Sequence, residues 1–281
     1  MSQLYSKKIV GYAACCISAL AVLTVLQMPK ADAASMTFSA TGTNPISGGN
    51  SAVLAAKAVF DDSIAGKLTL TLTNTGPGAS APSDVLTGIF WDYAGSALTS
   101  LTLSSAKAAT VITNDKITGT NVNLTNVGGG KVEWGFAKTT ASSGLGGESG
   151  VANPVTQHYG LGTAGFGISP GFGVGGTQQF NYGIITGYDS NANSKLLGDK
   201  AETFVKNSAT FVFSGLPTGF DSTKIQNVRF QYGTGLDEPS TYYIAPPPPP
   251  KKVPEPSATV AFGLFALGAL RVAKKKPLVL A

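Results

Sequence analysis

Strict alternation of apolar and polar residues over residues 67–73 is the pattern that most limits how this chain can fold. Leu68, Leu70 and Leu72 are separated by threonines, and successive side chains of an extended chain point to opposite faces. The leucines therefore share one face and the threonines the other, which a helix of about 3.6 residues per turn does not reproduce. The segment predicts a half-buried β-strand whose leucine face lies on a hydrophobic core.

The body of the chain, residues 34–245, has a matching composition. It is rich in threonine, valine, phenylalanine, isoleucine, tyrosine and glycine, and it contains few leucine-rich helical patterns. Turn signals with glycine and proline separate the apolar runs. One short helix is expected, at residues 51–60 or 194–204. Further strands are predicted at residues 88–92, 98–103, 110–113, 132–136, 179–185, 209–213 and 226–232.

These short strands predict an all-β fold, a single antiparallel β-sandwich or jelly-roll-like domain over residues 34–245. In the last strand Val228 and Phe230 share one face, and Arg229 and Gln231 share the other. A body of about 210 residues is long enough for one well-formed core. The glycine-rich residues 144–176 show no sustained period and predict a long surface excursion.

Residues 1–33 have the pattern of a secretory signal peptide. Two lysines precede an apolar stretch over residues 9–26, and the small residues Ala31 and Ala33 then mark a cleavage site at the end of the segment. An uncleaved signal anchor is the alternative. Both cysteines of the chain lie in this segment, so the processed protein is predicted to form no disulfide.

The last residues of the chain form three zones. Residues 246–256 are rich in proline and predict a polyproline II stalk. Residues 257–273 are apolar and predict a short transmembrane helix, which reaches about 25 Å against a hydrocarbon core of about 30 Å. Residues 274–281 begin with lysines, which resist crossing a bilayer. This basic end is therefore expected in the cytoplasm and the body outside.

In their order and spacing these zones resemble the PEP-CTERM signal of bacterial proteins that exosortases sort. The resemblance implies a transient membrane anchor, with signal peptidase and exosortase as partners, on a protein exported to the cell surface or extracellular matrix. An ordinary anchor that is never cut has the same hydropathy and stays the alternative. The residues that carry the resemblance are the sorting motif Val253, Pro254, Glu255 and Pro256 and the basic stop cluster Arg271, Lys274, Lys275 and Lys276.

A weaker resemblance covers much of the body. It is similar to a subgroup of exosortase-dependent surface proteins to which no activity is assigned. This likeness implies a location and no reaction. The resemblance also links exosortase systems with polysaccharide export, so exopolysaccharide is the expected partner. The segments that carry the likeness are residues 68–75, 84–90, 182–184, 230–234 and 238–239.

Positive charge is concentrated at the two ends of the chain. The whole chain carries +5, of which residues 1–33 contribute +2 and residues 246–281 contribute +5, so the body carries −2. A basic isoelectric point therefore reflects the targeting segments. With no basic stripe left on the body, we predict no binding to nucleic acid.

Few residues of the body suggest catalysis. His158 is the only histidine of the chain, and a solvated loop position is expected for it. A single histidine without cysteine also excludes the usual zinc sites. Asp61, Asp62 and Asp92 could supply a glycosidase-like carboxylate pair, but exposed loop acids are the simpler interpretation. No catalytic residue is assigned, and the protein is predicted not to be an enzyme.

One segment is a candidate metal site. Asp189, Asn191 and Asn193 place side-chain oxygens at alternate positions, which suits a hard cation such as Ca²⁺. The segment lacks a bidentate acid at the position where a calcium loop supplies one, because Lys200 stands there. An Asx-rich turn is the other interpretation. No other cofactor is expected.

Aromatic residues supply the candidate carbohydrate contacts. Tyr159, Phe166 and Phe172 lie in or near the glycine-rich stretch, where a ring can stack on a sugar. Trp91 and Trp134 lie in strand patterns and are expected in the core. The leading function is therefore a non-enzymatic surface or matrix protein associated with exopolysaccharide. The alternative is a secreted glycan-active hydrolase, which needs converging carboxylates in a cleft.

Overall fold

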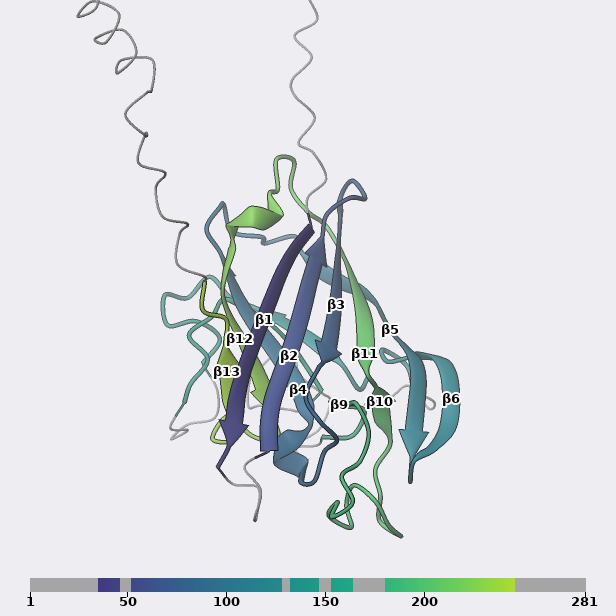
Figure 1. The fold of residues 1–281 in the computed structure, drawn as a ribbon. Helices are drawn as coiled ribbons and strands as arrows, with labels where there is room; N and C mark the ends of the chain where they lie inside the picture. The colour runs from purple at the N-terminus through teal and green to yellow at the C-terminus, as the bar shows by residue number, and fades with distance from the viewer. Residues whose placement is uncertain (1–34, 46–51, 128–131, 147–152, 164–179, 246–281) are drawn as a thin grey trace, which may run out of the picture.

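The computed structural model describes residues 35–45, 52–127, 132–146, 153–163 and 180–245 (Figure 1). Within these ranges the protein is all-β, as predicted, and 13 strands join in one large mixed sheet. The predicted signal peptide, stalk, sorting helix and basic end lie outside the described residues. Among the residues described, none of the helices has the length and apolar character needed to span a membrane.

The described elements are β1 (Ser35–Asn44), β2 (Ala52–Asp61), β3 (Lys67–Asn74), η1 (Pro82–Asp84), β4 (Leu86–Tyr93), β5 (Thr102–Thr113), β6 (Lys116–Asn123), β7 (Gly135–Lys138), β8 (Tyr159–Gly162), β9 (Ile184–Ile185), β10 (Phe204–Lys206), β11 (Ser208–Ser214), η2 (Ser222–Lys224), β12 (Ile225–Tyr232) and β13 (Ser240–Tyr242).

The sheet turns back on itself so that two layers face each other, an arrangement consistent with a β-sandwich (Figure 1). The strand order is β1-β2-β3-β11-β5-β10-β9-β4-β12-β13, with β6 beside β5, β8 beside β4 and β7 beside β8. The strand pairs are antiparallel except β9 with β10, which run parallel. The purely antiparallel sheet predicted from the sequence is therefore wrong at this pair. A long connection over residues 186–203 allows the parallel pairing.

Aromatic rings from both layers meet in the core. Trp91 on β4 packs against Phe60 on β2 and Phe213 on β11, with ring centroids 5.4 Å and 6.1 Å apart. Trp134 packs against Phe211 at 4.9 Å. Both tryptophans are fully buried, which confirms the core positions expected for them.

The alternating segment behaves as its pattern predicts. It forms β3, and its three leucines, 68, 70 and 72, have no exposed surface while the intervening threonines are half-buried. Burying a leucine side chain stabilises a fold by about 1.5–3 kcal/mol, so this one face is a substantial part of the core. The prediction of a strand with its leucines inward is confirmed.

The short helix expected at residues 51–60 is wrong. This segment forms β2, hydrogen-bonded to β1 on one side and β3 on the other. Leu54, Ala56, Ala58 and Phe60 are buried at every second position, so the period is two, and the alanines favoured a helix only by intrinsic propensity. Residues 194–203 form turns and bends, and β10 follows them, so this alternative helix is absent as well.

The glycine-rich stretch contains an internal strand. The surface excursion predicted over residues 144–176 is therefore wrong for Tyr159–Gly162, which forms β8 between β4 and β7 and is buried throughout. A Cβ atom on Gly160 would lie 2.5 Å from Cδ1 of Phe90. Glycine is needed here for close packing of neighbouring strands, and not for a mobile loop.

Both faces of β12 are buried, although alternation placed Arg229 and Gln231 on an opposite, polar face. They do lie on the opposite face, but they are buried, because the turn that follows β12 contacts Gln231 and the carbonyls of residues 153 and 154 accept from Arg229. The Gln231 amide donates to the Gly235 carbonyl (2.8 Å) and accepts from the Arg229 guanidinium (2.7 Å). Glu238 accepts from the amides of Thr234 and Gly235 and closes this turn.

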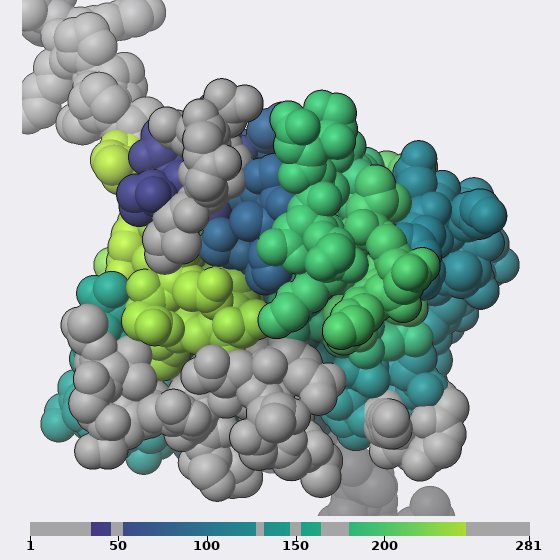
Figure 2. Space-filling model, turned by 90° about the horizontal axis from the view of Figure 1, so that it is seen from below, coloured from purple at the N-terminus to yellow at the C-terminus, as the bar shows by residue number. Residues whose placement is uncertain are grey.

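The two ends of the described body lie at the same edge. Phe38 on β1 packs edge-to-face on Tyr243, which follows β13, with ring centroids 5.0 Å apart. The long connection at residues 186–203 lies on the surface that Figure 2 shows from below, in green. Its Leu196 packs with Ile185 and Phe204, which flank the connection, in a small separate core.

Candidate functional site

A groove lies between the start of β5 and strand β7. Its volume is about 600 Å³. β7 pairs with β8, and the groove follows β7 and the residues just before it. Most of the lining is apolar, and Lys138 is the one charged residue among the described residues that form it. The groove is lined by Leu101, Thr102, Leu103, Thr125, Val132, Trp134, Gly135, Phe136 and Lys138.

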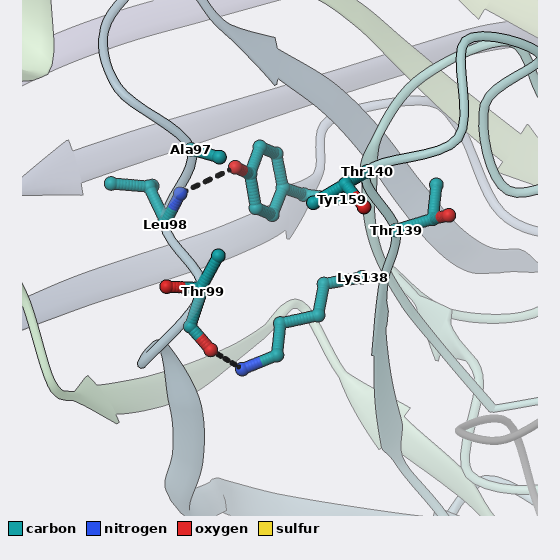
Figure 3. Close-up of a pocket in the computed structure, with 7 residues that line it drawn as sticks. All are labelled: Ala97, Leu98, Thr99, Lys138, Thr139, Thr140 and Tyr159. Atoms are coloured by element: carbon teal, nitrogen blue, oxygen red, sulfur yellow. Dashed lines mark hydrogen bonds between the residues drawn. The ribbon is translucent and has the colours of Figure 1, made fainter.

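A second, more polar pocket adjoins the groove at Lys138 (Figure 3). Its volume is about 320 Å³, near the lower end of the range of about 300–1,000 Å³ for small-molecule sites. Three segments form it, namely the loop before β5, the end of β7 and the start of β8. The lining residues are Ala97, Leu98, Thr99, Lys138, Thr139, Thr140 and Tyr159.

Lys138 is held in place between the two pockets. Its ammonium nitrogen donates to the backbone carbonyls of Thr99 and Leu101, the second at 2.7 Å (Figure 3 shows the first). Both acceptors are neutral. Within the described residues no carboxylate lies within ion-pair distance of Lys138. The charge is therefore fixed by the backbone and left without an anionic partner from that part of the chain.

Two hydroxyl groups of the pocket use their oxygens as acceptors. The Tyr159 hydroxyl accepts from the Leu98 amide at 2.8 Å, and the Thr139 hydroxyl accepts from the Ala141 amide at 3.1 Å. Burial raises the pKa of Tyr159 above its ordinary value of 10.0, so the phenol keeps its proton at neutral pH. Both hydroxyl protons remain to be donated.

The predicted carbohydrate contacts have different outcomes. The Tyr159 side chain lies at the pocket, but the residue is only 4% exposed and its ring stacks on Trp91, 6.0 Å away. Its ring face therefore has no room for a sugar, and only its hydroxyl lines the pocket. Phe166 and Phe172 lie outside the described residues.

His158 makes a defined contact with Asp92 and is not a fully solvated loop residue. Its Nδ1 lies 2.7 Å from the Asp92 carboxylate, and its backbone amide donates to the same oxygen at 2.9 Å. The Asn227 amide donates to the other carboxylate oxygen. Within the described residues no serine or threonine hydroxyl is bonded to the imidazole, so the pair lacks the nucleophile of a hydrolytic triad.

The other acids singled out from the sequence have local structural contacts. Hydrogen bonds from the side chain and from the backbone amide of Ser63 lower the pKa of Asp61. Asp62 accepts from the Ser222 amide. Among the described residues, no aspartate or glutamate lines the groove or the pocket. The carboxylate pair that a glycosidase needs is therefore not provided by either of these two hollows.

The candidate calcium segment is folded as a series of turns. The Asp189 carboxylate accepts from the Asn191 amide, and the Asn193 side-chain oxygen accepts from the Lys195 amide, each at 2.9 Å. These contacts are typical of Asx turns. In the part of the chain that the structure describes, no three acidic, histidine or cysteine side chains gather as a metal site.

The remaining predicted positions lie outside the described residues. They are the cleavage residues Ala31 and Ala33, the sorting motif at residues 253–256 and the basic cluster at residues 271–276. Lys138, Thr139 and Leu98 were not predicted as site residues. Leu98 lies far from Lys138 and Thr139 in the sequence, and hydrogen bonds of Lys138 and Tyr159 with the loop at residues 98–101 join the two segments.

No protein-family model, curated protein or solved structure matches this chain. The site is therefore interpreted from its own geometry.

Proposed function

We propose that this protein is an exported, exosortase-processed protein of the bacterial cell surface or extracellular matrix, non-enzymatic and associated with exopolysaccharide. One observation carries the proposal. A secretory pattern over residues 1–33 is combined with a sorting motif, an apolar segment and a lysine cluster over residues 253–276. Export brings the body across the membrane, and the lysines oppose passage of the last segment.

The β body fits the role of a domain displayed outside the cell. We propose the finer description of a jelly-roll-like sandwich, joined to the membrane by the stalk until the tail is removed. A polyproline II stalk over residues 246–256, at about 3.1 Å per residue, would span about 30 Å. Tyr243, close to the end of the described chain, packs on Phe38 of β1, the first strand of the sheet, so we propose that the tether leaves from that edge of the sandwich.

The groove and the pocket support a role in binding. The groove is mostly apolar, the pocket is more polar, and Lys138 lines both. Sugar chains combine apolar CH faces with hydroxyl groups, and this lining offers partners for both. The hydrolase alternative is not adopted, because none of the described residues that line the two hollows carries a carboxylate.

Cell fractionation tests the proposal. The full chain and a variant that ends at Ala245 are produced in the same bacterium, with and without its exosortase. We expect the full chain at the surface or in the matrix, its accumulation in the membrane when the exosortase is missing, and release of the truncated chain into the medium. Equal surface retention of both chains would rule out the tail as a sorting signal, and a cytosolic full chain would rule out export.

A further inference from the structure

The pocket beside Lys138 offers hydrogen-bond donors on the side chains of Lys138 and Tyr159. Lys138 has three N–H bonds, of which two are used by the carbonyls of Thr99 and Leu101, so one remains. The Tyr159 oxygen already accepts from the Leu98 amide, so its proton is left to donate. Lys138 and Tyr159 therefore each present a donor in the lining of this hollow, whereas the Thr139 hydroxyl points away from them (Figure 3).

The positive charge in this pocket is unusual for a surface lysine. The side chain of a surface lysine on a strand normally moves freely and keeps its ammonium group in water. Such an ammonium group contributes little to binding. Lys138 is instead tied to two carbonyls of the loop before β5, so part of the side-chain entropy is lost before any ligand arrives. An anion that meets this ammonium group meets a preorganised partner.

The combination of donors and charge selects the chemistry of the ligand. A carboxylate has two oxygens that only accept hydrogen bonds, and it carries the opposite charge. A neutral sugar hydroxyl gains less from the same groups, because it carries no charge opposite to the ammonium group and because a hydrogen bond from a neutral hydroxyl to a carboxylate is roughly twice as strong as one between two neutral groups. The apolar groove that shares Lys138 then provides a surface for the rest of a chain.

We propose that the Lys138 pocket binds the carboxylate of an acidic sugar, so that the exopolysaccharide recognised by this protein is a uronate-type polymer. This inference rests on the proposed association with exopolysaccharide and names its chemical class. In the complex the ammonium group of Lys138 and the hydroxyl of Tyr159 donate to the carboxylate, while adjoining sugar rings lie along the groove between β5 and β7.

Calorimetry with the processed body, purified from the medium, tests the proposal. The probes are trigalacturonate, the neutral trisaccharide maltotriose and sodium acetate. We expect trigalacturonate to bind at least about tenfold more tightly than maltotriose and acetate, with affinity that falls as salt rises. Equal binding of maltotriose would overturn the acidic-sugar assignment, and equal binding of acetate would reduce the pocket to a simple anion site.

Variants separate binding from folding. Lys138→Gln is expected to lower the trigalacturonate affinity about tenfold and to remove most of its salt dependence, whereas Lys138→Arg keeps the charge and retains much of the affinity. The matched control is Lys107→Gln, an exposed lysine on β5 that changes the net charge equally. Thermal melts establish that each variant is folded. Equal affinity of Lys138→Gln and Lys107→Gln would refute the proposal.

The proposal and the broader function fail in different ways. If the protein is found at the surface and binds only neutral polymers, the acidic-sugar inference is wrong and the surface function stands. If fractionation places the full chain in the cytosol, the broader function is wrong whatever the pocket binds.

Discussion

Replacement of Gly160 by alanine tests whether β8 is an internal strand. A Cβ atom at this position would lie 2.5 Å from Cδ1 of Phe90 and 2.9 Å from Leu145 Cδ1. Phe90 has no exposed surface, and the Arg229 guanidinium lies 5.8 Å from the centre of its ring. The ring therefore has little space into which it can move.

The expected cost follows from two opposing effects. Forcing an extra methyl group into a packed interior costs about 1–3 kcal/mol. Removing glycine from the unfolded chain offsets about 0.4–1 kcal/mol of this, because the backbone of Gly160 does not have a positive φ. The net loss of unfolding free energy should be about 1–2 kcal/mol. For a domain of this size, that lowers Tm by roughly 2–8 °C.

The measurement is thermal and urea unfolding of the processed body, followed by circular dichroism. The matched control is Gly187→Ala, because a Cβ atom there meets nothing within 4 Å and the stability should stay the same or rise slightly. If Gly160→Ala melts with the wild type and the control, β8 does not pack as described, and the glycine-rich segment is a surface excursion after all.

Two further predictions concern buried polar groups. Gln231→Leu removes the group that accepts from the Arg229 guanidinium and donates to the Gly235 carbonyl, so the free energy of unfolding in urea should fall by about 2–4 kcal/mol. The control Gln226→Leu, at an exposed position, should change this free energy by less than about 0.5 kcal/mol. Similar unfolding midpoints for the two variants would contradict the buried network. Burial also raises the pKa of Tyr159 and of Tyr232 above 10.0, so the folded state holds protons that the unfolded chain loses. This stability is fully present below about pH 10 and is lost as pH rises above it, which urea unfolding at about pH 9 and about pH 11 will measure; equal stability at both values would show that these phenols are not protected.

The local sequence pattern was enough to predict the strands whose apolar residues face the main core. The leucines of β3 alternate cleanly, and the apolar residues of β4 and β11 flank strong turn signals, so these strands could be predicted. β2 could not, because alanine fits both a strand and a helix and only its pairing with β1 and β3 decides. In β8 the glycines concealed a strand, since their role is contact with Phe90 across the sheet.

The candidate site depended on tertiary structure to a greater degree. No local sequence pattern distinguishes Lys138 from other strand lysines. Its ammonium group is positioned by two backbone carbonyls more than thirty residues earlier in the chain. Tyr159 was predicted as a site residue for its ring, but the structure assigns that ring to Trp91 and leaves the hydroxyl for the pocket. Side-chain direction of this kind follows from strand pairing and not from residue type.

Export and sorting are the central claim, and the mass of the mature protein tests them most directly. The protein is isolated from the surface and matrix fraction of the producing bacterium, and its intact mass and terminal residues are determined by mass spectrometry. The account predicts a chain that begins at Ala34 and has lost the lysines at residues 274–276. A chain recovered from the cytosol with both terminal segments still attached would contradict it.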